Sequence, residues 1–388
     1  MADSPDYLVC AVLPAGGCGE RTGMKTPKQY CQVLSRPLVA YTLQAFERVP
    51  WIKHIVITIH NDYKDLLLDV ISTHNLKKIH IVGAGPTRHR SIWEGIKSLG
   101  KVCPVPEVVI IHDAVRPFVE SDILWKIVEA ARECGAAGAI RPLVSTILAV
   151  DGDGFLDHSL DRSKYRASEM PQAFQYNIIK TAYEKCTDYD FDYGTECLHL
   201  AQRYGGAKVR LIDGPDSLWK VTLKKDLAAA EDTIKDWKKN VVLVNCPEKI
   251  QSEVSRAFEL QNFKLHITTY GAMGPSSANH YIIFHTIYNQ QSILQMSKDF
   301  LNNYAGTAVV TTVLHVVTTC QLGPEDLDYF KVQACIQRLQ ENVADDVCVA
   351  LLFDMTDSPK KLIELLLTLV RSQNPILGGQ IYTILADS

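Results

Sequence analysis

Residues 108–117 read Val-Val-Ile-Ile-His-Asp-Ala-Val-Arg-Pro, an apolar run that ends in an acidic and then a basic side chain. A short run of only apolar residues is typical of a strand that is buried on both faces, as in parallel sheets. Outward from it, similar runs at residues 8–13, 54–59 and 78–82 alternate with helical periodicity, as at residues 38–48. This alternation predicts an α/β fold with a mostly parallel sheet.

The length of the chain indicates more than one domain, because 388 residues exceed the usual size of a single core. A new apolar run begins at Val241 after a charged helical segment, which places the boundary near Asn240. Residues 1–240 would form the first domain, and residues 241–388 a second, Rossmann-like α/β domain. Within the first, residues 141–175 hold an Asp-Gly-Asp-Gly turn between extended segments and predict a projecting β-arm. Further elements are expected as strands at residues 281–288, 308–318 and 347–353 and as helices at residues 292–305 and 359–373.

Composition limits the classes of partner. The formal net charge of −4 gives no long-range attraction for polyanions, so neither nucleic acid nor an anionic membrane surface is expected. No apolar run reaches transmembrane length, and the acidic amino terminus lacks the features of a secretory signal. The 11 cysteines include no Cys-X-X-Cys pair, which argues against a zinc site and a disulfide framework. These features predict a cytosolic protein with reduced thiols.

A glycine-rich loop follows the first apolar run, where residues 13–21 read Leu-Pro-Ala-Gly-Gly-Cys-Gly-Glu-Arg. Glycines let backbone amides approach phosphate oxygens closely. The loop lacks the Gly-Lys-Ser/Thr ending of a Walker motif, and it lacks the third glycine of the dinucleotide fingerprint. Instead Arg21, Lys25 and Lys28 follow within a few residues, which suits neutralisation of a triphosphate. The competing interpretation is a solvated basic surface.

Asp113 comes at the carboxyl end of the apolar run 108–111, and ligands bind at that edge of open parallel sheets. Carboxylate oxygen is the ligand that Mg²⁺ prefers, so Asp113 is the first expected ligand of a magnesium ion that bridges nucleotide phosphates. Two alternatives are a cap for a helix that begins near Ser121 and an ion pair with Arg116. His112 is expected to be a packed strand-end histidine without a catalytic role.

Three motifs, in this order, resemble the IspD-type cytidylyltransferases. They are the glycine-rich loop with Pro-Lys-Gln-Tyr at 27–30, the run His-Asp-Ala-Val-Arg-Pro at 112–117, and Lys-Val-Thr at 220–222. The resemblance covers residues 7 to about 232 and implies a Rossmann-like nucleotidyltransferase fold of the GT-A-like kind, with CTP as substrate and Mg²⁺ as cofactor. It implies catalytic roles for Arg21, Lys28 and Lys220. It also implies CTP contacts from Pro14, Ala15, Gly16, Gly17, Gly19, Gly85, Arg88 and Ser91. A helix cap at Thr87 or Ser91 is the competing interpretation.

The same resemblance assigns a second substrate, a polyol phosphate, to Arg116, Thr146, Arg162 and Thr195. Thr146 and Arg162 match positions that cross to a neighbouring subunit, so a homodimer formed through the β-arm is implied. A local ion pair of Arg162 with Asp161 is the alternative. Asp216, shortly before Lys220, is a second candidate magnesium ligand.

The whole layout resembles the animal members of this family. It implies that a cytidylyl group passes from CTP to D-ribitol 5-phosphate, giving CDP-ribitol for the O-mannosyl glycan of α-dystroglycan. Two alternatives are the reaction with 2-C-methyl-D-erythritol 4-phosphate and a non-catalytic nucleotide-binding scaffold. In the second domain, Pro-Glu-Lys-Ile at 247–250 replaces the glycines that a dinucleotide would need, so its role stays open among dimer support, partner docking and stability.

Overall fold

The computed structural model describes most of the chain as two compact units, one of almost all of residues 2–227 and one of residues 228–388. Each unit has its own sheet. The described residues are 5–17, 26–34, 36–194, 196–237, 239–261, 263–269, 280–285, 312–318, 348–354, 359–372 and 381–384, with single residues at 291, 293, 295 and 334.

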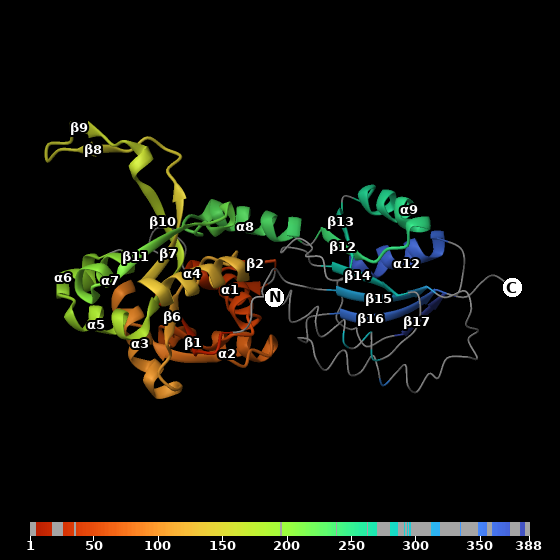
Figure 1. Cartoon of the computed structure of the whole chain (residues 1–388), viewed down its shortest axis with the longest axis horizontal. Helices are drawn as coiled ribbons and strands as arrows, with labels where there is room; N and C mark the ends of the chain where they lie inside the picture. Colours follow the sequence, from red (N-terminus) through yellow and green to blue (C-terminus); the bar gives the residue numbers. More distant parts are fainter. Residues whose placement is uncertain are drawn as a thin grey trace. The chain divides into compact units, whose positions relative to one another are not determined.

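A mostly parallel sheet forms the centre of the first unit (Figure 1). In the order in which they lie side by side, its strands are β11 (Lys208–Asp213), β7 (Gly135–Pro142), β10 (Arg166–Gln175), β6 (Val108–Ile111), β1 (Val9–Pro14), β4 (Ile52–Ile59) and β5 (Ile79–Gly83). Only β10 is reversed among these seven, since it pairs antiparallel with both β6 and β7. The predicted α/β fold with a mostly parallel sheet is therefore confirmed.

Helices cover both faces of this sheet, because successive side chains of a strand point to opposite faces. Val9, Ala11 and Leu13 of β1 belong to one buried cluster, and Cys10 and Val12 belong to the other. The first cluster packs under α1 (Leu38–Glu47), α2 (Lys64–Thr73) and α4 (Ser121–Cys134). The second packs under α3 (Arg88–Val102), α5 (Tyr176–Lys185) and α7 (Cys197–Gly205). None of the described helices is both long enough and apolar enough to cross a membrane.

The segment predicted as a β-arm, residues 141–175, is divided between two structures. A hairpin of β8 (Leu148–Val150) and β9 (Leu156–Ser159) projects from the unit (Figure 1). Residues 166–175, in contrast, are β10 and lie inside the main sheet. The arm is thus shorter than predicted. The sequence did not reveal β10 as a strand of the main sheet, because it contains the polar Gln172 and the neighbouring Pro171 and its register shifts between Ser168 and Gln172.

The described residues of the second unit include six strands that pair in parallel to form one sheet. Their order is β13 (Lys264–Thr268), β12 (Asn240–Val244), β14 (His280–His285), β15 (Thr312–Thr318), β16 (Cys348–Asp354) and β17 (Ile381–Ile384). Apolar side chains of α9 (Glu248–Glu259) and α12 (Pro359–Ser372) cover one face. A second α/β domain is therefore present. The helix expected at residues 292–305 lies mostly outside the described residues, and the transition between the units falls within α8 (Lys224–Trp237).

Candidate active site

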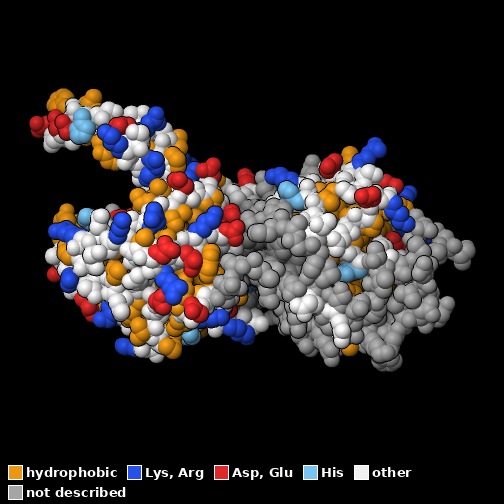
Figure 2. Space-filling model, viewed as in Figure 1, with side chains coloured by type: hydrophobic (Ala, Val, Ile, Leu, Met, Phe, Trp, Pro, Cys, Tyr) orange, Lys and Arg blue, Asp and Glu red, His pale blue; other side chains and the backbone are white. Residues whose placement is uncertain are grey.

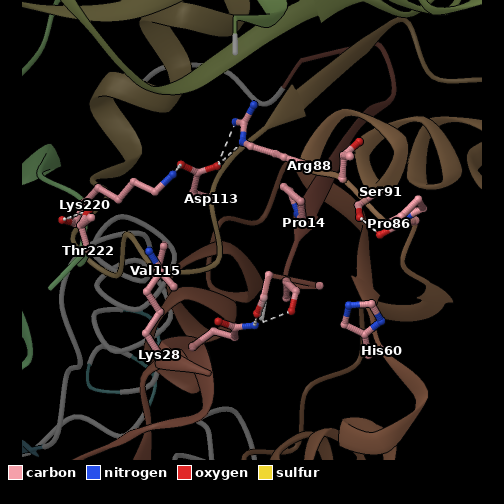
Figure 3. Close-up of a pocket in the computed structure, with 16 residues that line it drawn as sticks. Pro14, Lys28, His60, Pro86, Arg88, Ser91, Asp113, Val115, Lys220 and Thr222 are labelled. Atoms are coloured by element: carbon pink, nitrogen blue, oxygen red, sulfur yellow. Dashed lines mark hydrogen bonds and ion pairs between the residues drawn. The ribbon is translucent and has the colours of Figure 1, made fainter. Parts of the chain in front are cut away.

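Four parallel strands of the first sheet, β5, β4, β1 and β6, end at the same edge. The chain beyond these ends builds a cavity of about 320 Å³, a size suited to a small ligand. It is lined by Pro14, Ala15, Gly16, Gly17, Lys28, Gln29, His60, Gly85, Pro86, Thr87, Arg88, Ser91, Asp113, Val115, Lys220 and Thr222 (Figure 3). The rule that ligands bind at strand carboxyl ends thus locates the cavity correctly.

The glycine-rich loop enters the cavity directly from β1. The Ala15 amide donates a 2.8 Å hydrogen bond to the Thr58 carbonyl. The pairing of β1 with β4 therefore extends one residue beyond Pro14. Gly16 then passes so close to the next segment that a Cβ atom on it would lie 2.4 Å from Cβ of Ala84. Only glycine fits there without a shift of the backbone. The predicted residues Gly19 and Arg21, and also Lys25, lie outside the described part of the chain.

Asp113 is the anionic centre of the site. Its Oδ1 accepts a 3.0 Å hydrogen bond from Arg88 Nε and lies 2.9 Å from Arg88 Nη2. Its Oδ2 lies 2.8 Å from Lys220 Nζ and 3.4 Å from Arg116 Nε. The structure therefore brings Arg88 and Lys220, which are 25 and 107 positions away in the sequence, to Asp113 and its near neighbour Arg116. The expected alternative of an ion pair with Arg116 is present, and it is one of three such pairs.

Burial alone would raise the pKa of the Asp113 carboxyl, which is fully enclosed. The three neighbouring cations outweigh burial and hold this pKa well below its usual range. The carboxylate is therefore ionised near pH 7, and it holds the Arg88 and Lys220 side chains at the edge of the cavity. Both of its oxygens already have cationic partners, so a metal ion would compete with these side chains for the carboxylate.

The side of the cavity opposite the two lysines is lined by a proline, a serine and a histidine. Figure 3 shows Pro86, Ser91 and His60 across the cavity from Lys28 and Lys220. Ser91 Oγ donates to the Gly85 carbonyl at 3.0 Å, which closes the turn before α3. This division suits a ligand with a polyanionic end and a neutral end.

Helix α3 presents Arg88 to Asp113 from its first turn. Thr87 is its cap, since the Thr87 side chain accepts from the Arg90 amide, and the same hydroxyl donates to the Phe191 carbonyl at 2.6 Å. The cap interpretation is thus confirmed for Thr87, although Thr87 also lines the cavity. Gly85 is required at the turn, because a Cβ there would lie 2.6 Å from Cβ of Arg90.

The predicted residues Arg116 and Asp216 do not line the cavity. Arg116 is buried and donates to Glu169 and to the Leu218 carbonyl in addition to its pair with Asp113. Asp216 pairs with Arg141, and its side chain is 95% exposed. No group of three or more His, Cys, Asp or Glu side chains arranged to bind a metal is found among the described residues. Of the two predicted magnesium ligands, Asp113 lines the cavity and Asp216 does not.

The residues predicted for the second substrate lie partly on the projecting hairpin. Arg162 donates to the Val144 carbonyl at 2.7 Å, and Asp161 pairs with Lys164 at 3.6 Å, so the expected ion pair of Arg162 with Asp161 is absent among the described contacts. Thr146 is in the same segment, ahead of β8. Thr195 lies outside the described residues.

His112 is fully buried, and its Nε2 lies 2.9 Å from the Arg116 carbonyl oxygen. Burial lowers the pKa of His112 to about 4, so the ring is neutral near pH 7. This is the packed strand-end histidine that the sequence predicted.

Several residues that line the cavity were missed in the sequence. They are Gln29, His60, Pro86, Val115 and Thr222. His60 directly follows β4, so the strand-end rule applied to the run 54–59 would have found it. Gln29 was visible only as the neighbour of Lys28 in a motif.

The fold and the site are typical of the nucleotidyltransferase class, with a glycine-rich loop and clustered cations at the carboxyl edge of a mostly parallel sheet. The family described as "2-C-methyl-D-erythritol 4-phosphate cytidylyltransferase" (IspD) matches residues 9–236. This chain belongs to that family.

Individual relatives from this family are similar to the chain in sequence and in structure. The chain is 55% identical over 256 residues to the D-ribitol-5-phosphate cytidylyltransferase of Mus musculus, which covers 65% of this chain and 57% of the mouse protein. It thus spans little more than half the length of that relative. It is 36% identical to the 2-C-methyl-D-erythritol 4-phosphate cytidylyltransferase of Syntrophus aciditrophicus, over 58% of this chain and 96% of that protein. The crystal structure of 4-diphosphocytidyl-2C-methyl-D-erythritol synthase from Anaerococcus prevotii superposes with a TM-score of 0.51 at 26% identity, covering 59% of this chain and 96% of that one.

Proposed function

We propose that this protein transfers a cytidylyl group from CTP to D-ribitol 5-phosphate and releases pyrophosphate. The observation that carries this proposal is the 55% identity to a D-ribitol-5-phosphate cytidylyltransferase in a stretch of 256 residues, against 36% to a relative named for methylerythritol phosphate. The cavity supports the nucleotide half of the proposal, because glycines and cations meet there. We also propose, from the resemblance alone, a cytosolic location and a supply of CDP-ribitol for the glycan of α-dystroglycan.

The chemistry needs no protein base. A phosphate monoester has a second pKa near 6, so its oxygens are largely anionic at neutral pH. One such oxygen attacks the α-phosphorus of CTP, a new P–O bond forms, and the bond from the α-phosphorus to the bridging oxygen breaks. The electron pair leaves with pyrophosphate. The protein's task is therefore to align the reactants and to stabilise charge on the phosphoryl oxygens.

Two lysines are placed for that task. Lys28 and Lys220 reach the cavity from different elements, and Lys220 is also paired with Asp113 at 2.8 Å (Figure 3). When a triphosphate enters, its oxygens would compete with Asp113 for the Lys220 ammonium group, so this lysine would be shared between the carboxylate and the ligand. Arg21 is proposed for the same role from the resemblance alone.

Magnesium remains part of the proposal. Mg²⁺ commonly takes one or two carboxylates and completes its shell with water and substrate phosphates. Asp113 is the single carboxylate among the residues that line the described cavity, and it would offer one oxygen once a cation has moved to the triphosphate. The ion would supply further neutralisation of the triphosphate charge.

A second copy of the chain would complete the binding site for the second substrate. The hairpin exposes large apolar side chains: Val144, Val150, Phe155 and Leu156 are 83%, 65%, 72% and 65% exposed (Figure 2). A two-stranded projection of this kind is only marginally stable by itself. We therefore propose a homodimer in which the hairpin of one subunit carries Thr146 and Arg162 to the acceptor site of the other. Sedimentation should show a dimer at micromolar concentration, and Leu156→Asp should shift it to monomer.

The test of the function is pyrophosphate release from CTP and Mg²⁺ with D-ribitol 5-phosphate, beside reactions with methylerythritol phosphate and with UTP. We expect turnover with CTP and ribitol phosphate, and its loss with a chelator. Turnover with methylerythritol phosphate instead would establish the second candidate, which the family match at residues 9–236 favours. CTP binding without turnover on any acceptor would support the scaffold alternative.

A further inference from the structure

Gln29 holds the glycine-rich loop by its backbone carbonyls. Its side-chain Nε2 donates 2.7 Å hydrogen bonds to the carbonyl oxygens of both Ala15 and Gly17. The residue is only 3% exposed, so these bonds form where water does not compete freely. Both hydrogens of one amide group are thereby used on one loop.

These two bonds fix the direction of the loop's amides. Because a peptide unit is planar and trans, a carbonyl of Ala15 aimed at Gln29 turns the N–H of Gly16 away from Gln29. Tyr30 reinforces the same carbonyl, since its hydroxyl donates to Ala15 at 3.2 Å while its ring stacks on Tyr63 at 4.1 Å between centroids. The loop segment that borders the cavity is thus held in one conformation before a ligand arrives.

The same contact also joins the loop to Lys28. Lys28 and Gln29 are consecutive in the 3-10 turn η2 (Lys28–Tyr30), and both line the cavity. A displacement of Gln29 would therefore move Lys28 and also break the two hydrogen bonds that hold the loop. No other side chain in the described cavity donates to carbonyls on both sides of Gly16.

We propose that Gln29 is a positioning residue for the nucleoside triphosphate, acting through the loop backbone and Lys28 and not through the acceptor. This inference rests on the proposed function for the identity of the nucleotide. It predicts an effect on the interaction with CTP and little effect on the interaction with the polyol phosphate.

Two substitutions test this role. Gln29→Met keeps the length of the side chain and removes both donors, and Gln29→Glu keeps the shape but sets a carboxylate against two carbonyl oxygens and beside the triphosphate. We expect the Kd of CTP with Mg²⁺, measured by calorimetry without acceptor, to rise about 10-fold in Gln29→Met, as for the loss of two hydrogen bonds, and further in Gln29→Glu. The KM for the acceptor should change less than about 2-fold.

Gln44→Met is the matched control, because Gln44 is equally buried, at 3% exposed, but lies on α1 and does not line the cavity. It should leave the Kd of CTP unchanged even if it lowers the melting temperature. A loss of kcat with an unaltered KM and Kd for CTP in a folded Gln29→Met protein would overturn the proposal, because it would show that Gln29 does not act on nucleotide binding. If Gln29→Met does not fold, the isosteric Gln29→Glu decides by the same measurement. Since binding is measured without acceptor, inactivity of the wild type towards ribitol phosphate would contradict the proposed reaction and leave this test intact.

Discussion

Each of the two sheets of this protein has a similar central strand, but the residues that follow this strand differ in chemistry between the two sheets. β1 and β12 are both buried strands with a parallel neighbour on each side. β1 runs into a loop of consecutive glycines beside Lys28. β12 runs into Asn245, Cys246 and Pro247, and proline has no N–H to offer a phosphate. A parallel sheet therefore provides an edge for a site, and the few residues beyond each strand decide whether a site forms.

The buried polar groups of the two units also differ, in their charge. In the first unit a buried carboxylate is ionised among three cations. In the second, His285 and His315 lie with Nε2 and Nδ1 3.0 Å apart, and burial lowers their pKa values to about 4 and about 3. That pair is neutral near pH 7, so it binds no anion by charge. The buried polar group of the first unit is thus stabilised by ion pairs, whereas the buried histidine pair of the second unit is uncharged.

The largest expected effect is that of Asp113→Asn. Removing one partner from a buried ionic cluster leaves the other charges uncompensated, which costs about 3–5 kcal/mol. We expect the unfolding free energy of the first unit to fall by that amount and pyrophosphate release to be lost, as measured by denaturant titration and a coupled assay. Asp354→Asn, at a buried carboxyl on β16 of the second unit, should leave turnover unchanged. Equal loss of turnover in both variants would break the contrast between the units.

Lys28→Ala should come next. A lost transition-state contact of this type costs about 2–4 kcal/mol, equivalent to roughly a thirtyfold to a thousandfold loss in kcat/KM. The melting temperature should stay close to that of the wild type. Lys249→Ala, in the first turn of α9 beyond β12, is the control and should keep full activity. An unfolded Lys28→Ala protein would show that the lysine is structural.

Acidification should act on the second sheet through His315. Its folded-state pKa of about 3 lies below an unfolded value of about 6.5, so the unfolded chain binds the proton more readily between these values. The stability contributed by the neutral ring is complete above pH 6.5 and is lost as the pH falls toward 3, by about 2 kcal/mol at pH 5. Hydrogen exchange of β14 and β15 should accelerate accordingly.

His315→Leu should reduce this pH dependence, whereas His266→Leu, at an exposed position on β13 of the same sheet, should not. An unaltered pH profile in His315→Leu would locate the titrating group elsewhere.

The smallest effect is expected at the helix caps. Thr87→Ala removes the hydroxyl that caps α3 and should destabilise the first unit by about 1 kcal/mol. Pro247→Ala, at the start of α9, removes no capping hydrogen bond from a side chain and should have a smaller effect. Urea midpoints for the two variants would compare them directly.

The sequence by itself determined the architecture and the location of the site. Short apolar runs such as residues 108–111 are typical of strands buried between layers, and their spacing in the chain leaves room for crossover helices, so the local pattern predicts the parallel sheet. The glycines after β1 and the acid after β6 were readable for the same reason. The reversed strand β10 was not, because its polar and proline residues hide a central position that only pairing with β6 and β7 creates.

The electrostatic arrangement was decided by the tertiary structure alone. Asp113 and Lys220 are 107 positions apart, and nothing in the intervening sequence states that they meet at 2.8 Å. The same holds for Gln29, whose two hydrogen bonds depend on how the loop and the 3-10 turn approach each other. Local sequence fixes which elements form because backbone propensity and apolar periodicity act over a few residues. Partners in a buried charge or hydrogen-bond network are fixed only when packing brings distant segments to within a few ångströms, where the low dielectric makes each pairing strong.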